Sequence, residues 1–230
     1  MKSNNKINKD NLPSSIPLFA VSGGLLLPQI EIPLNVFEER YLNMIDDCLA
    51  ERRLIGMIQP KQGLTASLGK KKKLYQTGCL GRIKAFNETD DGRYLIVVSG
   101  VCRFELGEEI DTMRGYRRFK VDYENFDDFN YDIEESNIEI NKEELISNID
   151  RYLGGKDVDA ILNGSENFAS MDSRFLVDFL CCYLPFSVEE KQLFVEAKSL
   201  EERTKALLDV LGMAAVDKVF STENNNKIIH

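Results

Sequence analysis

Apolar residues in the first part of the chain alternate with polar ones. The alternation runs through Ile16–Ala20 and again through Ile30–Leu34, which is the spacing of a strand with one buried face. Gly23-Gly24 interrupts it, and two glycines permit the positive φ that a tight turn requires. The apolar stretch Leu25–Pro28 follows the turn. This part of the pattern predicts two short strands joined by a turn and an apolar loop.

The spacing then becomes helical. From Phe37 to Leu49 apolar residues recur every three or four positions, which predicts an amphipathic helix. Asn35 and Glu38 stand at the spacing of a capping box. We therefore expect a helix over 35–51 that caps one end of a β-structure.

Strand-like runs separated by turn signals follow this helix. Gly78 and Gly81 lie inside one run and predict a bulge or a close backbone approach. Asp91-Gly92 predicts a hairpin turn, and Ser99-Gly100 predicts another turn. The expected strands cover 54–58, 74–86, 93–98, 101–110 and 116–123. One helix among many short strands predicts a small barrel or sandwich over 15–123.

The second half of the chain has an acidic stretch followed by helical spacing of its apolar residues. Residues 122–144 carry ten acidic residues and one Lys, so we expect an acidic linker over 124–140. Helical spacing then continues, with capping boxes at Asn141, Ser187 and Ser199. The expected helices are 142–153, 157–163, 171–184, 188–196, 200–211 and 213–220. The fold class is therefore α+β, with an all-α helical bundle subdomain over 141–220. We expect a disordered tail at 1–14 and a frayed tail at 221–230.

Charge and composition narrow the function classes. The 230 residues carry a net charge of −9, divided into +5 over residues 1–121 and −14 over 122–230. An acidic chain is unlike a dedicated nucleic-acid binder. The five cysteines are an odd, scattered set, which is typical of a reducing compartment. With no long apolar run and no signal-peptide pattern, we expect a cytoplasmic protein that does not enter a membrane.

Catalytic signatures are missing from the sequence. The single histidine is the last residue, His230, so a His-based triad would depend on the chain end. Gly63–Lys70 resembles a phosphate loop but has five residues between its glycines instead of four, and Lys71 follows where Ser or Thr is needed. There is neither a Gly-x-Ser-x-Gly elbow nor a C-x-x-C pair. We expect no enzyme activity, no cofactor and no metal.

Three kinds of function stay open on the residues alone. The basic run Lys70–Lys73, with Arg114, Arg117, Arg118 and Lys120, is compatible with an RNA-associated module. A cleft between barrel and helices is compatible with an enzyme acting on a small molecule. The Leu25–Pro28 loop or an unpaired strand edge is compatible with binding of an extended polypeptide.

The chain also resembles a known family. The opening IPLF strand at Ile16–Phe19 and the helix beginning at FEERY, Phe37–Tyr41, resemble the start of the Lon protease N-terminal, substrate-binding domain. Further matching motifs are Leu27-Pro28, Pro33-Leu34, Gly78–Ile83, Asp91–Tyr94, Gly100–Phe104, Leu184-Pro185 and Lys191-Gln192. The resemblance covers about Ile16 to Leu211. Gln29 stands where this family often has Gly, and Ser22-Gly23-Gly24 stands where a Pro-Gly-like turn is common.

This resemblance implies a PUA-like β pseudobarrel capped by one helix and followed by a helical subdomain. It further implies a stand-alone, non-catalytic polypeptide-binding protein without the ATPase and Ser-Lys protease modules, acting as an adaptor in protein quality control. Its expected partners are unfolded or extended polypeptides and a protease or chaperone. The candidate peptide-binding residues are Leu26, Leu27, Pro28, Phe37, Tyr41, Arg103 and Phe104.

Overall fold

The computed structural model describes residues 9–61, 72–129, 140–154 and 171–225, and side chains within these ranges up to residue 213. The fold class is α+β, as expected. Two compact units divide the chain: the first contains Met1–Tyr131 and Phe186–Glu196, and the second contains Asp132–Pro185 and Ala197–His230. Each unit is described separately below.

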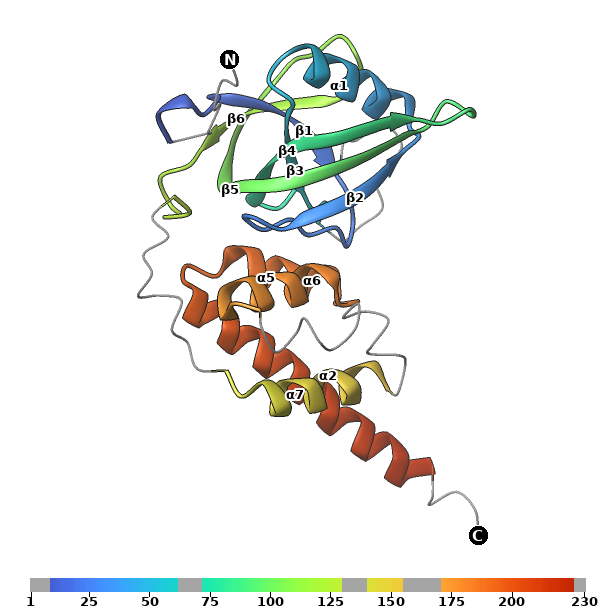
Figure 1. Cartoon of the computed structure of the whole chain (residues 1–230), viewed down its shortest axis with the longest axis vertical. Coiled ribbons are helices and arrows are strands. Elements are labelled where there is room, and N and C mark those ends of the chain that lie inside the picture. Colours follow the sequence, from blue (N-terminus) through green and yellow to red (C-terminus); the bar gives the residue numbers. More distant parts are fainter. Residues whose placement is uncertain (1–8, 62–71, 130–139, 155–170, 226–230) are drawn as a thin grey trace. The chain divides into compact units, whose positions relative to one another are not determined.

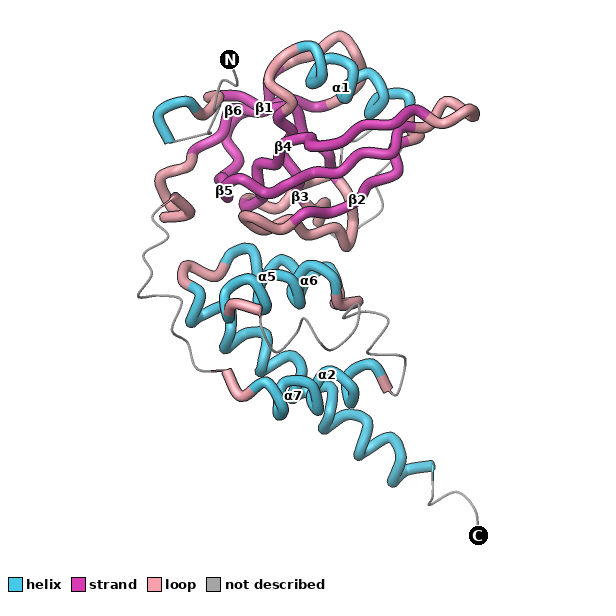
Figure 2. The backbone as a smooth tube through the Cα atoms, viewed as in Figure 1, coloured by secondary structure: helices cyan, strands magenta, loops and turns pink. Residues whose placement is uncertain are grey.

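Six strands of the first unit form one mixed sheet (Figures 1 and 2). They are β1 (Ser15–Ala20), β2 (Glu31–Val36), β3 (Leu54–Ile58), β4 (Thr77–Glu88), β5 (Tyr94–Ile110) and β6 (Arg117–Asp122). Their order is β2-β5-β4-β3-β1-β6, and β5 also pairs with β6. This last pairing closes β1, β3, β4, β5 and β6 into a ring. Only β1 and β3 run parallel.

Strand β5 is long enough to pair with different strands along its two halves. Its 17 residues pair with β2 through Tyr94–Ser99 and with β6 through Glu105–Ile110. The expected turn at Ser99-Gly100 is wrong, because both residues lie inside this strand. The predicted hairpin turn at Asp91-Gly92 is confirmed, with Gly92 at φ 78°.

Glycines permit a close approach in the middle of β4 and β5. A β-bulge follows Leu80, where the register with β5 shifts, and this confirms the irregularity predicted from Gly78 and Gly81. A Cβ atom at Gly100 would lie 2.0 Å from the carbonyl oxygen of Leu27. The Gly-containing strand centre therefore lets the apolar loop before β2 pack directly on the backbone.

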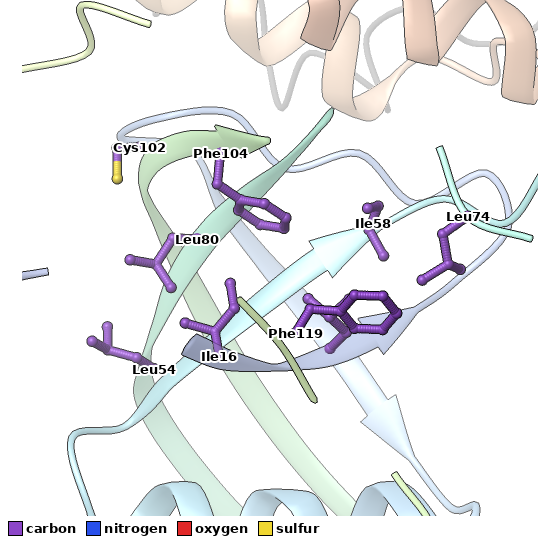
Figure 3. Packing of buried hydrophobic residues seen from close by; sticks show 9 residues of the cluster. Ile16, Leu54, Ile58, Leu74, Leu80, Cys102, Phe104 and Phe119 are labelled. Carbon is purple, nitrogen blue, oxygen red and sulfur yellow. The ribbon is translucent and has the colours of Figure 1, made fainter. Parts of the chain in front are cut away.

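The core of the ring is apolar and draws on every strand around it. Figure 3 shows Phe104 and Leu80 packed with Ile16 and Phe119, and all four are at most 5% exposed. Burying one such large apolar side chain stabilises the fold by about 1.5–3 kcal/mol. The alternation predicted from the sequence appears in β2, where Ile32 and Val36 are buried and Pro33 is exposed. In β1 it does not, because Ile16–Phe19 are all buried and both faces of that strand are covered.

Helix α1 (Glu39–Ala50) lies over one end of these strands (Figure 1). It begins four residues later than expected, because Asn35 belongs to β2 and pairs there with Leu95. Glu38 is the N-cap residue but makes no capping bond, so the predicted Asn35–Glu38 capping box is wrong. The buried face predicted for this helix is present, through Tyr41, Met44, Ile45 and Cys48.

Helix α6 (Val188–Glu196) belongs to the first unit although it lies late in the sequence. The Nζ of Lys191 donates to the carbonyl oxygen of Gly23 at 2.8 Å, and α6 packs against β4. Ser187 and Glu190 form the predicted reciprocal capping box. The structure thus differs from an uninterrupted helical subdomain over 141–220, because residues 186–196 group with the strands.

The second unit contains α2 (Lys142–Leu153), α5 (Ser173–Tyr183) and α7 (Leu200–Asn225), and both α2 and α5 pack on α7. The caps predicted at Asn141 and Ser199 are confirmed. A buried ion pair joins Arg203 to Asp178 at 2.5 Å. The separate helices expected over 200–211 and 213–220 are one helix, since Gly212 costs only about 1 kcal/mol in a helix interior. The helix expected over 157–163 lies outside the described residues.

Candidate functional site

The apolar loop predicted to contact a polypeptide is part of the core. Leu26 and Leu27 are 1% and 0% exposed, and Pro28 is also buried. The backbone N–H of Gln29 donates to the Gly100 carbonyl at 3.0 Å, and the N–H of Gly100 donates to the Ile30 carbonyl at 2.9 Å. These bonds hold the loop against β5, so Leu26–Pro28 present no surface to a ligand.

Three more of the predicted contact residues are buried. The hydroxyl of Tyr41 donates to the Ala20 carbonyl at 3.1 Å, and Phe104 is fully enclosed in the ring. Arg103 is 4% exposed and is fully engaged by buried partners. Phe37, 66% exposed between β2 and α1, is the one residue of the predicted set that lies at the surface. The seven candidates therefore do not form one site.

Arg103 instead positions a neighbouring segment. Its Nη2 donates to Asp128 at 2.7 Å, and its Nη1 donates to the carbonyl of Val195 at 3.3 Å. The guanidinium also lies over the ring of Phe126, 4.2 Å from the centroid. These contacts fix residues 126–129 beside β5, where Asp128 and Phe129 line a cavity.

This cavity is a place in the described part of the first unit that could take a ligand. Its volume is about 660 Å³, within the range of small-molecule and peptide-side-chain sites. Five separate segments meet there: the loop before β2, the turn after α1, the bulged parts of β4 and β5, and the segment fixed by Arg103. The lining residues are Gln29, Arg53, Arg82, Ile83, Lys84, Ser99, Gly100, Val101, Asp128 and Phe129.

Two residues of the cavity wall adopt the left-handed backbone conformation. Gln29 has φ 66° and Arg53 has φ 60°, and no other non-glycine residue in the described ranges has a positive φ. Each costs about 1–2 kcal/mol relative to glycine at the same position. Backbone bonds hold Arg53 in place, since its N–H donates to the Cys48 carbonyl at 2.8 Å and its carbonyl accepts from Ile83 at 2.8 Å.

The charge of the lining is positive although the chain is acidic. Arg53, Arg82 and Lys84 contribute cations, and Asp128 is the one acidic residue in the lining. The carboxylate of Asp128 is already bound by the guanidinium and the backbone N–H of Arg103. The lining therefore favours an anionic group.

An outward apolar row lies next to the cavity. Ser99, Val97 and Leu95 alternate along β5 and so share one face of the sheet. Across the ladder, Val97 is opposite Pro33 of β2 and Ala85 of β4. Leu95 is 44% exposed, and Pro33 and Ala85 are also exposed. We call Pro33, Ala85, Leu95 and Val97 the apolar row; it leads into the cavity at Ser99.

Other chemistry receives little support from the described residues. No cluster of three potential metal ligands occurs among them. Burial raises the pKa of the Cys48 thiol to about 12 and raises those of Cys102 and Cys181 as well, so these thiols stay protonated and are poor nucleophiles. His230 and the Gly63–Lys70 segment lie outside the described part of the chain.

The basic residues considered for RNA binding are largely engaged within the first unit. Arg114 pairs with Asp47, and Arg117 pairs with Glu109 at 2.8 Å. Lys120 pairs with Glu108 at 2.8 Å, and Arg118 donates to the hydroxyl of Ser15 at 3.3 Å. Lys70 and Lys71 lie outside the described residues. The acidic partners reduce the positive field that a phosphate backbone needs.

Solved structures share this arrangement of strands and helices. A Lon N-terminal domain protein from Xanthomonas campestris matches 86% of this chain and 98% of its own, with a TM-score of 0.58 and 21% identity. The N-terminal domain of Lon protease from Mycobacterium avium complex matches the same shares of the two chains, with a TM-score of 0.53 and 16% identity. At these identities the likeness shows the fold.

Sequence comparison shows the family. The profile of the ATP-dependent protease La (LON) substrate-binding domain matches residues 15–212, and the chain belongs to this family. The Lon protease of Heliobacterium modesticaldum is 26% identical over 201 residues, which are 85% of this chain and 23% of that protein. Lon protease 2 of Myxococcus xanthus is 23% identical over 206 residues, 89% of this chain and 24% of that protein. The chain thus spans about a quarter of these relatives.

No described helix is long and apolar enough to cross a membrane.

Proposed function

We propose that this chain is a non-catalytic polypeptide-binding domain that recognises extended segments of unfolded proteins. The observation that carries the proposal is the apolar row, with exposed Pro33, Ala85 and Leu95 around half-buried Val97, which leads into the 660 Å³ cavity. Exposed apolar residues that adjoin a cavity are typical of binding surfaces. The family's description as a substrate-binding domain supports the same role.

The face of the sheet supports this role better than its edge. β2 is the terminal strand of the sheet order, so its outer side could in principle accept an added strand. Pro33 removes a backbone donor from β2, and Glu31 adds a charge at its start, both of which discourage strand addition. We therefore propose that an extended polypeptide segment lies across the outward face and that its apolar side chains contact Leu95 and Val97.

The family also suggests how such binding is used. The curated relatives are Lon proteases that are about four times as long as this chain. We propose that this chain acts as an adaptor in protein quality control and passes bound polypeptides to a protease or chaperone. We further propose that the closed ring of five strands, with α1 over one end, is a PUA-like pseudobarrel, and that the second unit is a small helical bundle.

The test uses a labelled peptide that is rich in Val and Leu, lacks acidic residues and has an amidated C-terminus. Fluorescence anisotropy should show saturable binding to the full chain. Leu95→Ser should weaken it about fivefold, since burying half of a Leu side chain is worth about 1 kcal/mol. Met113→Ser is the matched control, because Met113 is fully exposed outside the apolar row. No saturable binding at high micromolar concentration, or equal loss in both variants, would contradict the proposal.

A further inference from the structure

The cavity at the end of the apolar row has properties that apolar contact does not require. Its lining carries Arg53, Arg82 and Lys84. We propose that it is a carboxylate-binding subsite, which gives the domain a preference for extended polypeptides that carry an acidic group beside apolar residues. This inference rests on the proposed polypeptide binding and names the class of segment that is bound.

Cationic side chains in the cavity wall are available to bind an anion. Within the described ranges, the side chains of Arg53 and Lys84 take part in none of the ion pairs of the structure. Arg82 makes other contacts. Glu31 pairs with Ser99, which pairs with Arg82 on the other side, and the negative charge of Glu31 offsets one positive charge of the wall. Asp128 is bound to Arg103. Two cations therefore remain for a ligand.

Backbone conformation supplies a second, independent observation. Arg53 and Gln29, the two non-glycine residues with positive φ, both line this cavity. At each position glycine would fit without strain, yet a long polar side chain is placed at the wall. Backbone strain is commonly kept at ligand-binding sites, and both instances in the described ranges lie in the wall of this cavity.

The neutral groups of the wall fit the same ligand. The amide of Gln29 and the hydroxyl of Ser99 can donate to the second oxygen of a carboxylate held by Arg53. Ser99 is also the residue that joins the cavity to the apolar row through Val97 and Leu95. One extended segment can thus reach both surfaces, with its carboxylate supplied by an Asp or Glu side chain or by a C-terminus.

The test compares three labelled peptides with the same Val- and Leu-rich core. One ends in two Asp residues with an amidated terminus, one ends in two Asn residues with a free carboxylate, and one ends in two Asn residues with an amidated terminus. At low salt we expect at least one carboxylate peptide to bind about fivefold more tightly than the neutral one, and added NaCl should remove the difference. Whichever of the two carboxylate peptides binds more tightly identifies an acidic side chain or a C-terminus as the source of the bound carboxylate.

Variants separate the cavity from general electrostatics. Arg53→Gln and Lys84→Gln should each remove most of the preference, whereas Lys120→Gln, which deletes a positive charge elsewhere, should keep it. Arg53→Gly should also lose the preference while raising Tm, because glycine relieves the strain at φ 60°. Loss of the carboxylate preference in a more stable variant excludes misfolding as its cause.

The outcomes distinguish the two proposals. Equal binding of all three peptides would overturn the carboxylate subsite and leave polypeptide binding intact. No binding of any peptide would overturn both. A single-stranded RNA that displaces the peptides in a manner dependent on Arg53 would also overturn the carboxylate assignment, since the cavity would then serve phosphate groups.

Discussion

The side-chain amide of Gln59, the residue that follows β3, donates a hydrogen bond to the side-chain oxygen of Gln192 on α6 at 3.2 Å. Both residues are buried, and they are 133 positions apart in the sequence. Gln59 also donates to the Val188 carbonyl at 3.0 Å, and Gln192 donates to the Thr77 carbonyl at 3.3 Å. This polar contact fixes α6 to the strands of the first unit.

Removing Gln192 should therefore destabilise the first unit. Gln192→Ala leaves the Thr77 carbonyl without that donor and the Gln59 amide with one fewer acceptor, at a cost of about 1–3 kcal/mol. Urea unfolding followed by circular dichroism measures the change. Leu193→Ala is the control, since Leu193 is the next residue of α6 and is 51% exposed. Equal effects of the two substitutions would contradict the role of the amide contact.

Breaking the Arg103–Asp128 pair should have a larger effect. Asp128→Asn leaves a buried guanidinium without its counter-charge, and we expect a loss of about 3–5 kcal/mol. Replacing both residues, with Arg103→Met and Asp128→Leu, should recover part of this stability. Asp90→Asn, at an exposed position of the turn between β4 and β5, should change stability by less than about 0.5 kcal/mol. A double variant that is no more stable than Asp128→Asn would contradict a purely electrostatic penalty.

Relieving backbone strain at the cavity should stabilise the protein. Gln29→Gly removes the cost of φ 66° and should raise the free energy of unfolding by about 1 kcal/mol. Gln76 is the matched position, because it is exposed and its φ is not positive. Gln76→Gly should lower stability by about 0.5–1 kcal/mol through added chain entropy. Stability changes of the same sign in the two variants would contradict the strain assignment.

Alkaline pH should weaken the fold through the buried thiols. Burial raises the pKa of Cys48 from 9.0 to about 12, so the folded state holds its proton more tightly than the unfolded state. The resulting stability is complete below pH 9 and is lost between pH 9 and 12, by up to about 1.4 kcal/mol per pH unit for one thiol. Unfolding curves across this window should show a shallower decline for Cys48→Ala than for the original chain.

The regular parts of the fold were predictable from local patterns. Period-two and helical spacing located the strands and most helices, and the Ser187–Glu190 capping box appears in the structure as a reciprocal pair of bonds. The incorrect predictions lie where strand pairing overrides the local conformational preference of a residue. Asn35 is a good helix cap, yet its backbone pairs with Leu95 in the sheet. Ser99-Gly100 reads as a turn, yet two neighbouring strands keep it extended.

The candidate site was not predictable in the same way. An apolar loop such as Leu26–Pro28 reads equally well as surface or core, and only the close approach at Gly100 decides for the core. The cavity is assembled from five segments that long-range contacts bring together, such as the bond of Gln29 to Gly100 and that of Asp128 to Arg103, and no local pattern encodes such contacts. One signal was present in the sequence: Gln29 occupies a loop position where glycine is common in the family, and it lies in the cavity wall.

The placement of α6 has a consequence for the order of events during synthesis. The first unit is interrupted by residues 132–185, so the ring strands emerge from the ribosome well before the helix that completes them. At ordinary rates of translation, the roughly 70 residues between the end of β6 and the end of α6 take about 4–15 s to appear. During that interval the amide of Gln59 lacks its helix partners. The nascent β unit must therefore persist in an incomplete form until its own C-terminal piece arrives.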